Sequence, residues 1–293
     1  DLNGTPERID PLIARILLRA NRMAQAKELL TKVAEQHHSS EARYTLALIA
    51  VEEKDNDAAI RYLRMIGPDD TEFEEAVYLH MRILRDSGRY NEAVGLLRKA
   101  VADGDRRRPL FYALLASLNE EKGRIDTALK YLRDGIDHFP DDEQLLFKSA
   151  ILLDKKGLQD EAITVMERVL ELYPEHPEAL NYIGYTWADR NINLDRALTY
   201  IEKAVELKPD NGYLLDSLGW VYYRLGRLSE AQTELEKAVQ LAPDDPNIFD
   251  HLGDVYTALE MTDKAREAYR RAIELDTNNS SEAAGALDRL LDE

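Results

Sequence analysis

The sequence contains no cysteine among its 293 residues. Disulfide bonds, thiolate metal sites and cysteine nucleophiles are therefore excluded, and the absence fits an oxidising compartment as well as a reducing one. Long hydrophobic runs are also missing, because the best candidate, Leu12 to Leu18, is short and is interrupted by Arg15. A membrane-spanning helix needs about 18 apolar residues, so we expect no direct membrane insertion by this segment.

Positive charge is scarce, with 38 Lys and Arg residues against 56 Asp and Glu residues and a formal net charge of -18. Such a surface repels nucleic acid and anionic lipid and attracts basic segments, so we expect no nucleic-acid partner. The densest basic stretch is Arg106-Arg107-Arg108. It is either a solvated joint or a docking point for an acidic partner or a second copy, and the oligomeric state stays open.

The side chains needed for catalysis are not gathered in any recognisable motif. The six histidines are scattered, and none has the i, i+4 spacing of a two-histidine metal pair. Glycine-rich phosphate loops and Gly-x-Ser-x-Gly elbows are missing. Asp55-Asn56-Asp57 matches three residues of a calcium loop but lacks the following Gly and the distal Glu. We therefore predict no catalytic residue, no metal and no cofactor, and hence not an enzyme.

What the sequence does contain is a repeat, clearest from Leu215 to Pro243. Small residues such as Gly219 and Ala231 recur where two helices of one repeat would cross, because a larger side chain would separate their backbones. Gly226 falls at the turn, where a left-handed conformation ends a helix. The second-helix alanine occurs eight times, at Ala26, Ala59, Ala93, Ala128, Ala162, Ala197, Ala231 and Ala265.

This pattern resembles the tetratricopeptide repeat family, whose helix-turn-helix unit is about 34 residues long. The resemblance implies an all-α, right-handed α-solenoid of about eight repeats. We expect a polar leader at 1–6, repeats one to three at 7–108, repeats four to eight at 109–279 and a capping helix at 280–293, with an irregular joint near residues 103–108. The first repeat is the poorest match and contains Pro11, so we expect further helices before Asp1.

In such arrays the first helix of every repeat lines the inner surface, with side chains at repeat positions 2, 5, 9 and 12 on one stripe. In the sixth and seventh repeats this stripe predicts partner-binding residues, namely Asn181, Tyr185, Tyr213, Asp216, Trp220 and Tyr223. Aromatic residues often anchor peptide interfaces. Two interpretations of Trp220 and Tyr185 stay open, contact with a partner or packing between neighbouring first helices. Trp187 and Tyr222 occupy the core position and are predicted to be buried.

The residues that define two specialised binding grooves of the family are missing from this sequence. Co-chaperone members grip a peptide carboxylate with Lys at position 5 and Asn at position 9, whereas these positions read Asn181 and Tyr185, then Asp216 and Trp220. Position 6 reads Tyr182, Ser217 and His251 in the last three repeats, so the asparagine ladder of the sugar-transferase members is missing too.

A closer resemblance covers about 178–276, on the blocks 179–190 and 215–226. These blocks are similar to the carboxyl-terminal repeats of bacterial outer-membrane lipoproteins, one type of which is an adaptor for a carboxyl-terminal processing protease. The resemblance implies a non-catalytic scaffold that binds a peptide or partner protein, a protease being one candidate. It also implies location in the periplasm, with outer-membrane anchoring through a preceding segment. The alternatives are a substrate-recruiting arm of a larger enzyme and a cytoplasmic assembly factor.

Overall fold

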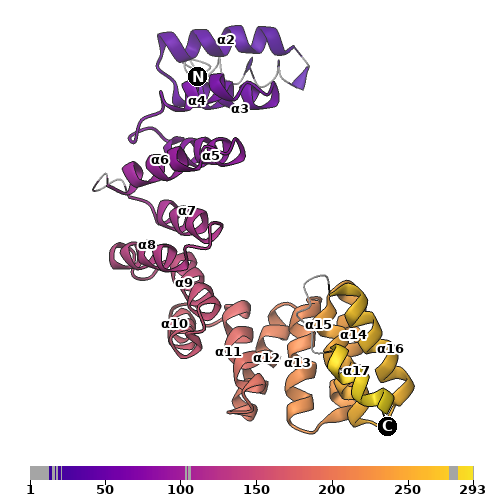
Figure 1. Ribbon diagram of the computed structural model, residues 1–293. Coiled ribbons are helices and arrows are strands. Elements are labelled where there is room, and N and C mark those ends of the chain that lie inside the picture. Colours follow the sequence, from indigo (N-terminus) through magenta and orange to yellow (C-terminus); the bar gives the residue numbers. More distant parts are fainter. Residues whose placement is uncertain are drawn as a thin grey trace, which may run out of the picture. The chain divides into compact units, whose positions relative to one another are not determined.

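The computed structural model describes residues 13, 14, 17, 19, 20, 22–102, 104, 107–276 and 283–292. Over these residues the chain forms sixteen helices and no strand, which confirms the predicted all-α class (Figure 1). Its internal contacts fall into two compact units, the first Asp1–Pro140 and the second Asp141–Glu293. The joint expected near residues 103–108 lies within the first unit. Several residues that carried predictions lie outside the described part of the chain, namely the leader at 1–6, Pro11, Asp103, Asp105 and Arg106. The predicted domain bounds stay a prediction.

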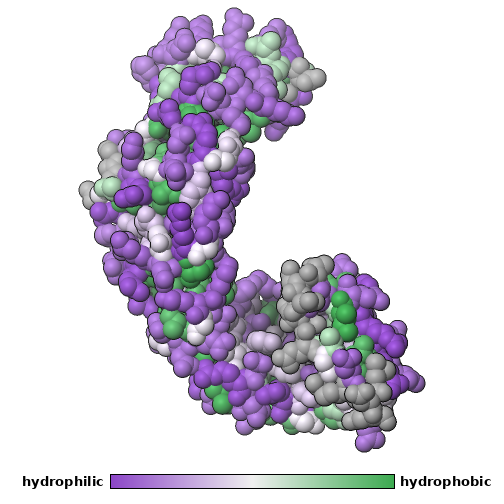
Figure 2. Space-filling view, in the orientation of Figure 1, coloured by the Kyte–Doolittle hydropathy of each residue, from purple (hydrophilic) through white to green (hydrophobic). Residues whose placement is uncertain are grey.

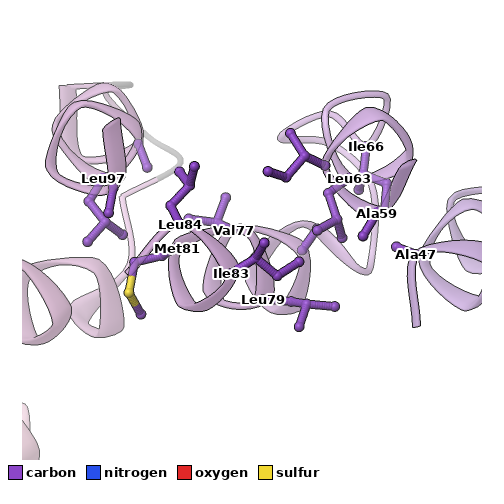
Figure 3. Close-up of a cluster of buried hydrophobic side chains, with 14 of the residues drawn as sticks. Ala47, Ala59, Leu63, Ile66, Val77, Leu79, Met81, Ile83, Leu84 and Leu97 are labelled. Carbon is purple, nitrogen blue, oxygen red and sulfur yellow. The ribbon is translucent and has the colours of Figure 1, made fainter. Parts of the chain in front are cut away.

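The first unit is a series of antiparallel helix pairs. Its helices are α2 (Met23–Gln36), α3 (Ser40–Glu52), α4 (Asn56–Leu63), α5 (Phe73–Asp86), α6 (Tyr90–Ala102), α7 (Pro109–Glu120) and α8 (Ile125–His138). Figure 3 shows part of its core, in which side chains of α5 such as Leu84 and Ile83 lie among Leu63 and Leu97 of the flanking helices. Met81 occupies the position that is small in other repeats, and it is buried.

The second unit continues the same pattern. Its helices are α9 (Glu143–Lys155), α10 (Gln159–Leu172), α11 (Pro177–Asp189), α12 (Leu194–Leu207), α13 (Gly212–Arg224), α14 (Leu228–Leu241), α15 (Pro246–Ala258), α16 (Thr262–Leu275) and α17 (Ala283–Asp292). Ala283, Ala286 and Leu290 of α17 join the core that α15 and α16 form. This is the packing expected of a capping helix, although the predicted cap residues Ser280 and Ser281 lie outside the described residues.

Two glycines show why the repeat pattern is so restrictive. A Cβ atom added to Gly219 would lie 2.5 Å from Cγ of Leu235, because α13 and α14 cross there in direct contact. Gly226 has a φ of +75°, in the left-handed region, and it ends α13 as predicted. The small and left-handed positions of the sequence pattern therefore have the structural roles that the spacing assigned to them.

The prediction for the core aromatic positions is right for one residue and wrong for the other. Trp187 is 5% exposed, as expected. Tyr222 is only partly buried, because its hydroxyl reaches Glu202 on α12 and the guanidinium of Arg227 lies 4.4 Å from its ring centroid.

Hydrophilic side chains cover most of the visible surface, with smaller hydrophobic patches between them (Figure 2).

Candidate functional site: the first-helix surface of α11, α13 and α15

The candidate site lies on the first helices of the last three repeats, all within the second unit. Helix α13 packs against α11 on one side and α15 on the other. We call their shared surface the aromatic face. We define it as Asn181 and Tyr185 of α11, Tyr213, Asp216, Trp220 and Tyr223 of α13, and Asp250, His251 and Asp254 of α15. This definition includes the six side chains that the sequence predicted as partner contacts, and their role in binding stays a prediction. Ring contacts and a hydrogen bond connect four of them, Tyr185, Asp216, Trp220 and Tyr223, through His251, whereas Asn181 and Tyr213 are included by their repeat positions.

Trp220 is the structural centre of the aromatic face. Its indole stacks on the imidazole of His251, with ring centroids 4.3 Å apart and an interplanar angle of 21°. The ring of Tyr223, one helical turn further along α13, stacks on it at 5.2 Å. Because Trp220 is only 7% exposed, the packing interpretation describes its position. Its part in partner binding stays a prediction, and the exposed aromatic surface belongs to the neighbouring tyrosines.

His251 joins the three helices and was not singled out by the sequence. Its Nδ1 lies 2.8 Å from the Asp216 carboxylate, and its ring centroid lies 6.3 Å from that of Tyr185. Burial disfavours the imidazolium, but the carboxylates of Asp216, Asp254 and Asp250 outweigh burial and raise the pKa of His251 above its ordinary value. The signal in the sequence is the 35-residue separation of Asp216 and His251, about one repeat, which sets them on adjacent first helices.

The tyrosines form the accessible part of the aromatic face. Tyr213, at the start of α13, is 59% exposed, while Tyr185 and Tyr223 are partly exposed. Burial, followed by the charges of Asp189 and Asp216, raises the pKa of Tyr185 to about 12. Burial and the charge of Asp254 raise the pKa of Tyr223 as well. These hydroxyls therefore stay neutral at physiological pH, and the face carries the charge of its carboxylates.

Two buried polar atoms of the aromatic face have no hydrogen-bond partner. They are Nε1 of Trp220, which is a donor, and Oδ1 of Asn181, which is an acceptor. A buried polar atom without a partner costs about 1–3 kcal/mol, so native structures rarely leave one unexplained. The face therefore has accessible rings above a packed interior in which two polar atoms lack a partner.

A groove beside α9 adjoins this surface through α11. It has a volume of about 810 Å³ and is lined mainly by Phe147, Ile151, Tyr173, His176 and Glu178. The imidazole of His176 stacks on Phe147 at 5.0 Å, and its Nδ1 accepts a hydrogen bond from the backbone N–H of Ala179 at the start of α11. Phe147 and Ile151, at positions 5 and 9 of the fifth repeat, thus form an apolar wall of the groove.

No group of three or more His, Cys, Asp or Glu side chains in the described part of the chain is arranged to hold a metal ion. None of the described helices is both long and apolar enough to cross a membrane. At the basic joint, Nε of Arg107 donates to the carbonyl of Val101, and Arg108 lies 3.6 Å from Glu74. These contacts fit the solvated-joint interpretation, and docking at this stretch stays a prediction.

Comparison with known proteins gives the same repeat along the chain. Models of the tetratricopeptide repeat match residues 17–83, 78–143, 147–212 and 247–279, and a TPR repeat model matches 219–259. TPR repeat-containing protein PA4667 of Pseudomonas aeruginosa is 29% identical over 190 residues, which are 65% of this chain and 32% of that protein. The chain therefore spans about a third of the length of this curated relative.

Solved structures share the fold. MamA from Desulfovibrio magneticus RS-1 is 25% identical with a TM-score of 0.50, over 59% of this chain and 97% of that one. A tetratricopeptide repeat protein from Parabacteroides merdae is 18% identical with a TM-score of 0.59, over 87% of this chain and 99% of that one. Repeats of this kind form extended surfaces that bind other proteins. Because repeat models cover nearly all of 17–279, the chain belongs to the tetratricopeptide repeat family of protein-interaction scaffolds.

Proposed function

We propose that this chain is a non-catalytic scaffold that binds a segment of a partner protein on the aromatic face. The observation that carries the proposal is the exposed ring of Tyr213 and the partly exposed rings of Tyr185 and Tyr223 beside the packed Trp220–His251 pair. Aromatic side chains over a packed support contribute strongly to protein interfaces. The Trp220–His251 stack supplies that support, because it holds α13 against α15 beneath Tyr223.

We further propose that the partner is a protease of the bacterial envelope and that the scaffold works as its adaptor in the periplasm, anchored through a preceding lipidated segment. Support comes from the resemblance of the blocks 179–190 and 215–226 to the repeats of outer-membrane lipoproteins of the adaptor type. The acidic surface and the lack of cysteine are compatible with that compartment.

Affinity capture from the membrane and periplasmic fraction of the native organism tests both statements. The bait is the full 293-residue chain beside a Tyr213→Ala, Tyr223→Ala variant. The matched control is Leu241→Ala, which removes an exposed apolar side chain from α14, the second helix of the seventh repeat. We expect about tenfold less partner on the double variant, because interface aromatics are often worth more than 1 kcal/mol each, and no change on the control.

The outcomes separate the two statements. A processing protease, identified by mass spectrometry and lost only with the tyrosine variant, supports the scaffold and the adaptor role. A different protein lost in the same way keeps the scaffold on the aromatic face and removes the adaptor role. Equal capture by wild type and variant contradicts the aromatic face as the binding surface.

A further inference from the structure

The charges on the first-helix surface of the second unit are one-sided. Repeat positions 2, 5, 9 and 12 of its four first helices carry carboxylates and no lysine or arginine. The acidic residues at these positions are Asp154, Glu178, Asp216, Asp250 and Asp254. The same positions of the first unit's α3, α5 and α7 carry both signs, with Glu41, Glu75 and Glu120 beside Arg82 and Arg85. A common acidic bias of the chain does not explain this difference, so the second unit's surface has a charge pattern of its own.

Three of these carboxylates lie on the aromatic face. Asp216 is paired with His251, while Asp254 accepts a hydrogen bond of 2.8 Å from the hydroxyl of Tyr269. All three, Asp216, Asp250 and Asp254, act on His251 in the direction that favours a positive charge. The local field thus stabilises a cation on this surface, even though burial of the imidazole opposes it.

The rings of the aromatic face suit a cation as well. A guanidinium or ammonium group is attracted to the face of an aromatic ring within about 6 Å of its centroid. On the aromatic face Arg224 already makes this contact, since its guanidinium carbon lies 5.4 Å from the Trp220 ring centroid. The partly exposed rings of Tyr185 and Tyr223, with the exposed ring of Tyr213, offer the same kind of contact to a side chain from outside.

The spread of the face indicates that the ligand is larger than a free cation. Tyr213 lies at the start of α13 and Tyr223 near its end, so one small ion cannot contact both rings. A polypeptide with a basic side chain can lie along these rings and bring its charge to the carboxylates. Nε1 of Trp220 and Oδ1 of Asn181 are themselves buried, so they lie out of direct reach of such a segment.

We propose that the aromatic face recognises a segment of the partner protein that carries lysine or arginine, with the basic side chain lying among the tyrosine rings and the carboxylates of Asp250 and Asp254. This inference rests on the proposed scaffold function and adds the chemical class of the segment. It also gives the direction of selectivity, because acidic segments would meet like charge on this surface.

Selection from a phage library of short random peptides, panned on the full chain, tests the inference. We expect the enriched peptides to contain lysine or arginine well above the library frequency. The best peptide should bind about tenfold more weakly to an Asp250→Asn, Asp254→Asn variant, because both amides keep the shape and lose the charge. A Glu41→Gln, Glu75→Gln variant of the first unit is the matched control and should bind as wild type. Binding should also weaken as salt is added.

Enrichment of neutral or acidic peptides, or no enrichment, would overturn the inference, as would equal affinity for the Asp250→Asn, Asp254→Asn variant and wild type. Circular dichroism of both variants verifies that the helices are retained. The capture experiment with Tyr213→Ala, Tyr223→Ala is independent of peptide charge. The scaffold function therefore stands if capture depends on the tyrosines while the library result is negative, and it fails if capture is unchanged.

Discussion

Each unit has a largely buried histidine on a first helix, and the surroundings of the two histidines shift their pKa values in opposite directions. His80 of α5 is 5% exposed, its Nε2 has no hydrogen-bond partner, and burial together with Arg64 and Arg89 lowers its pKa to about 4. His251 of α15 pairs with Asp216, and the carboxylates around it overcome burial and raise its pKa. The repeat scaffold is common to both sites, so the side chains that the repeat pattern leaves free decide the chemistry of each surface.

The largest effect is expected from acidification of the first unit. The unfolded chain protonates His80 near pH 6.5, whereas the folded chain resists protonation down to about pH 4. The free energy of unfolding should therefore decrease as the pH is lowered from about 6.5 to about 4, by up to about 3 kcal/mol in total. Hydrogen exchange measured by mass spectrometry resolves α5 and α6 from the second unit. His80→Gln should flatten this pH dependence, and an unchanged pH dependence in that variant would remove His80 as its cause.

The next effect concerns the helix crossings of the second unit. In Gly253→Ala the new Cβ atom would lie 2.4 Å from Cε1 of Tyr269, whose hydroxyl is held by Asp254. The ring cannot move without losing that hydrogen bond, so we expect a cost of about 1–3 kcal/mol in urea denaturation.

The control for this variant is Gly95→Ala in the interior of α6, where an added Cβ has no neighbour within 4 Å. Helix propensity alone then applies, and the control should be neutral or stabilising by up to about 1 kcal/mol. Equal destabilisation by the two substitutions would show that the close crossing at Gly253 has no special energetic role.

A smaller effect, of opposite sign in pH, is expected at His251. Its raised pKa means that the ion pair with Asp216 contributes stability fully below pH 6.5, and that this contribution is lost as the pH rises through the folded-state pKa. Trp187 and Trp220 both lie in the second unit, so tryptophan fluorescence reports its unfolding. His251→Gln should remove the loss at rising pH. A stability that increases over this range in wild type would contradict the assigned direction.

The helical repeat fold could be predicted from the sequence more completely than the candidate site. The second-helix alanines, Gly219 and Gly226 follow from repeat geometry, because only small or left-handed residues fit there. Tyr222 was misjudged, since its position in the pattern gives the direction of the side chain but not the depth at which the hydroxyl ends. His251 looked isolated because its partner Asp216 lies one repeat away, and long-range pairs of this kind depend on how neighbouring first helices pack. The burial of Trp220 depends on the same packing.

The measurement that most directly tests the aromatic face as the binding surface is site-specific photocrosslinking in cells of the native organism. A benzophenone amino acid replaces Tyr213 of the aromatic face, Tyr78 of α5 or Leu241 of α14, all of which are more than a third exposed. We predict a covalent adduct with the partner from position 213 and none from position 241, with position 78 weaker than 213. Adducts from position 78 or 241 without one from 213 would contradict the assignment.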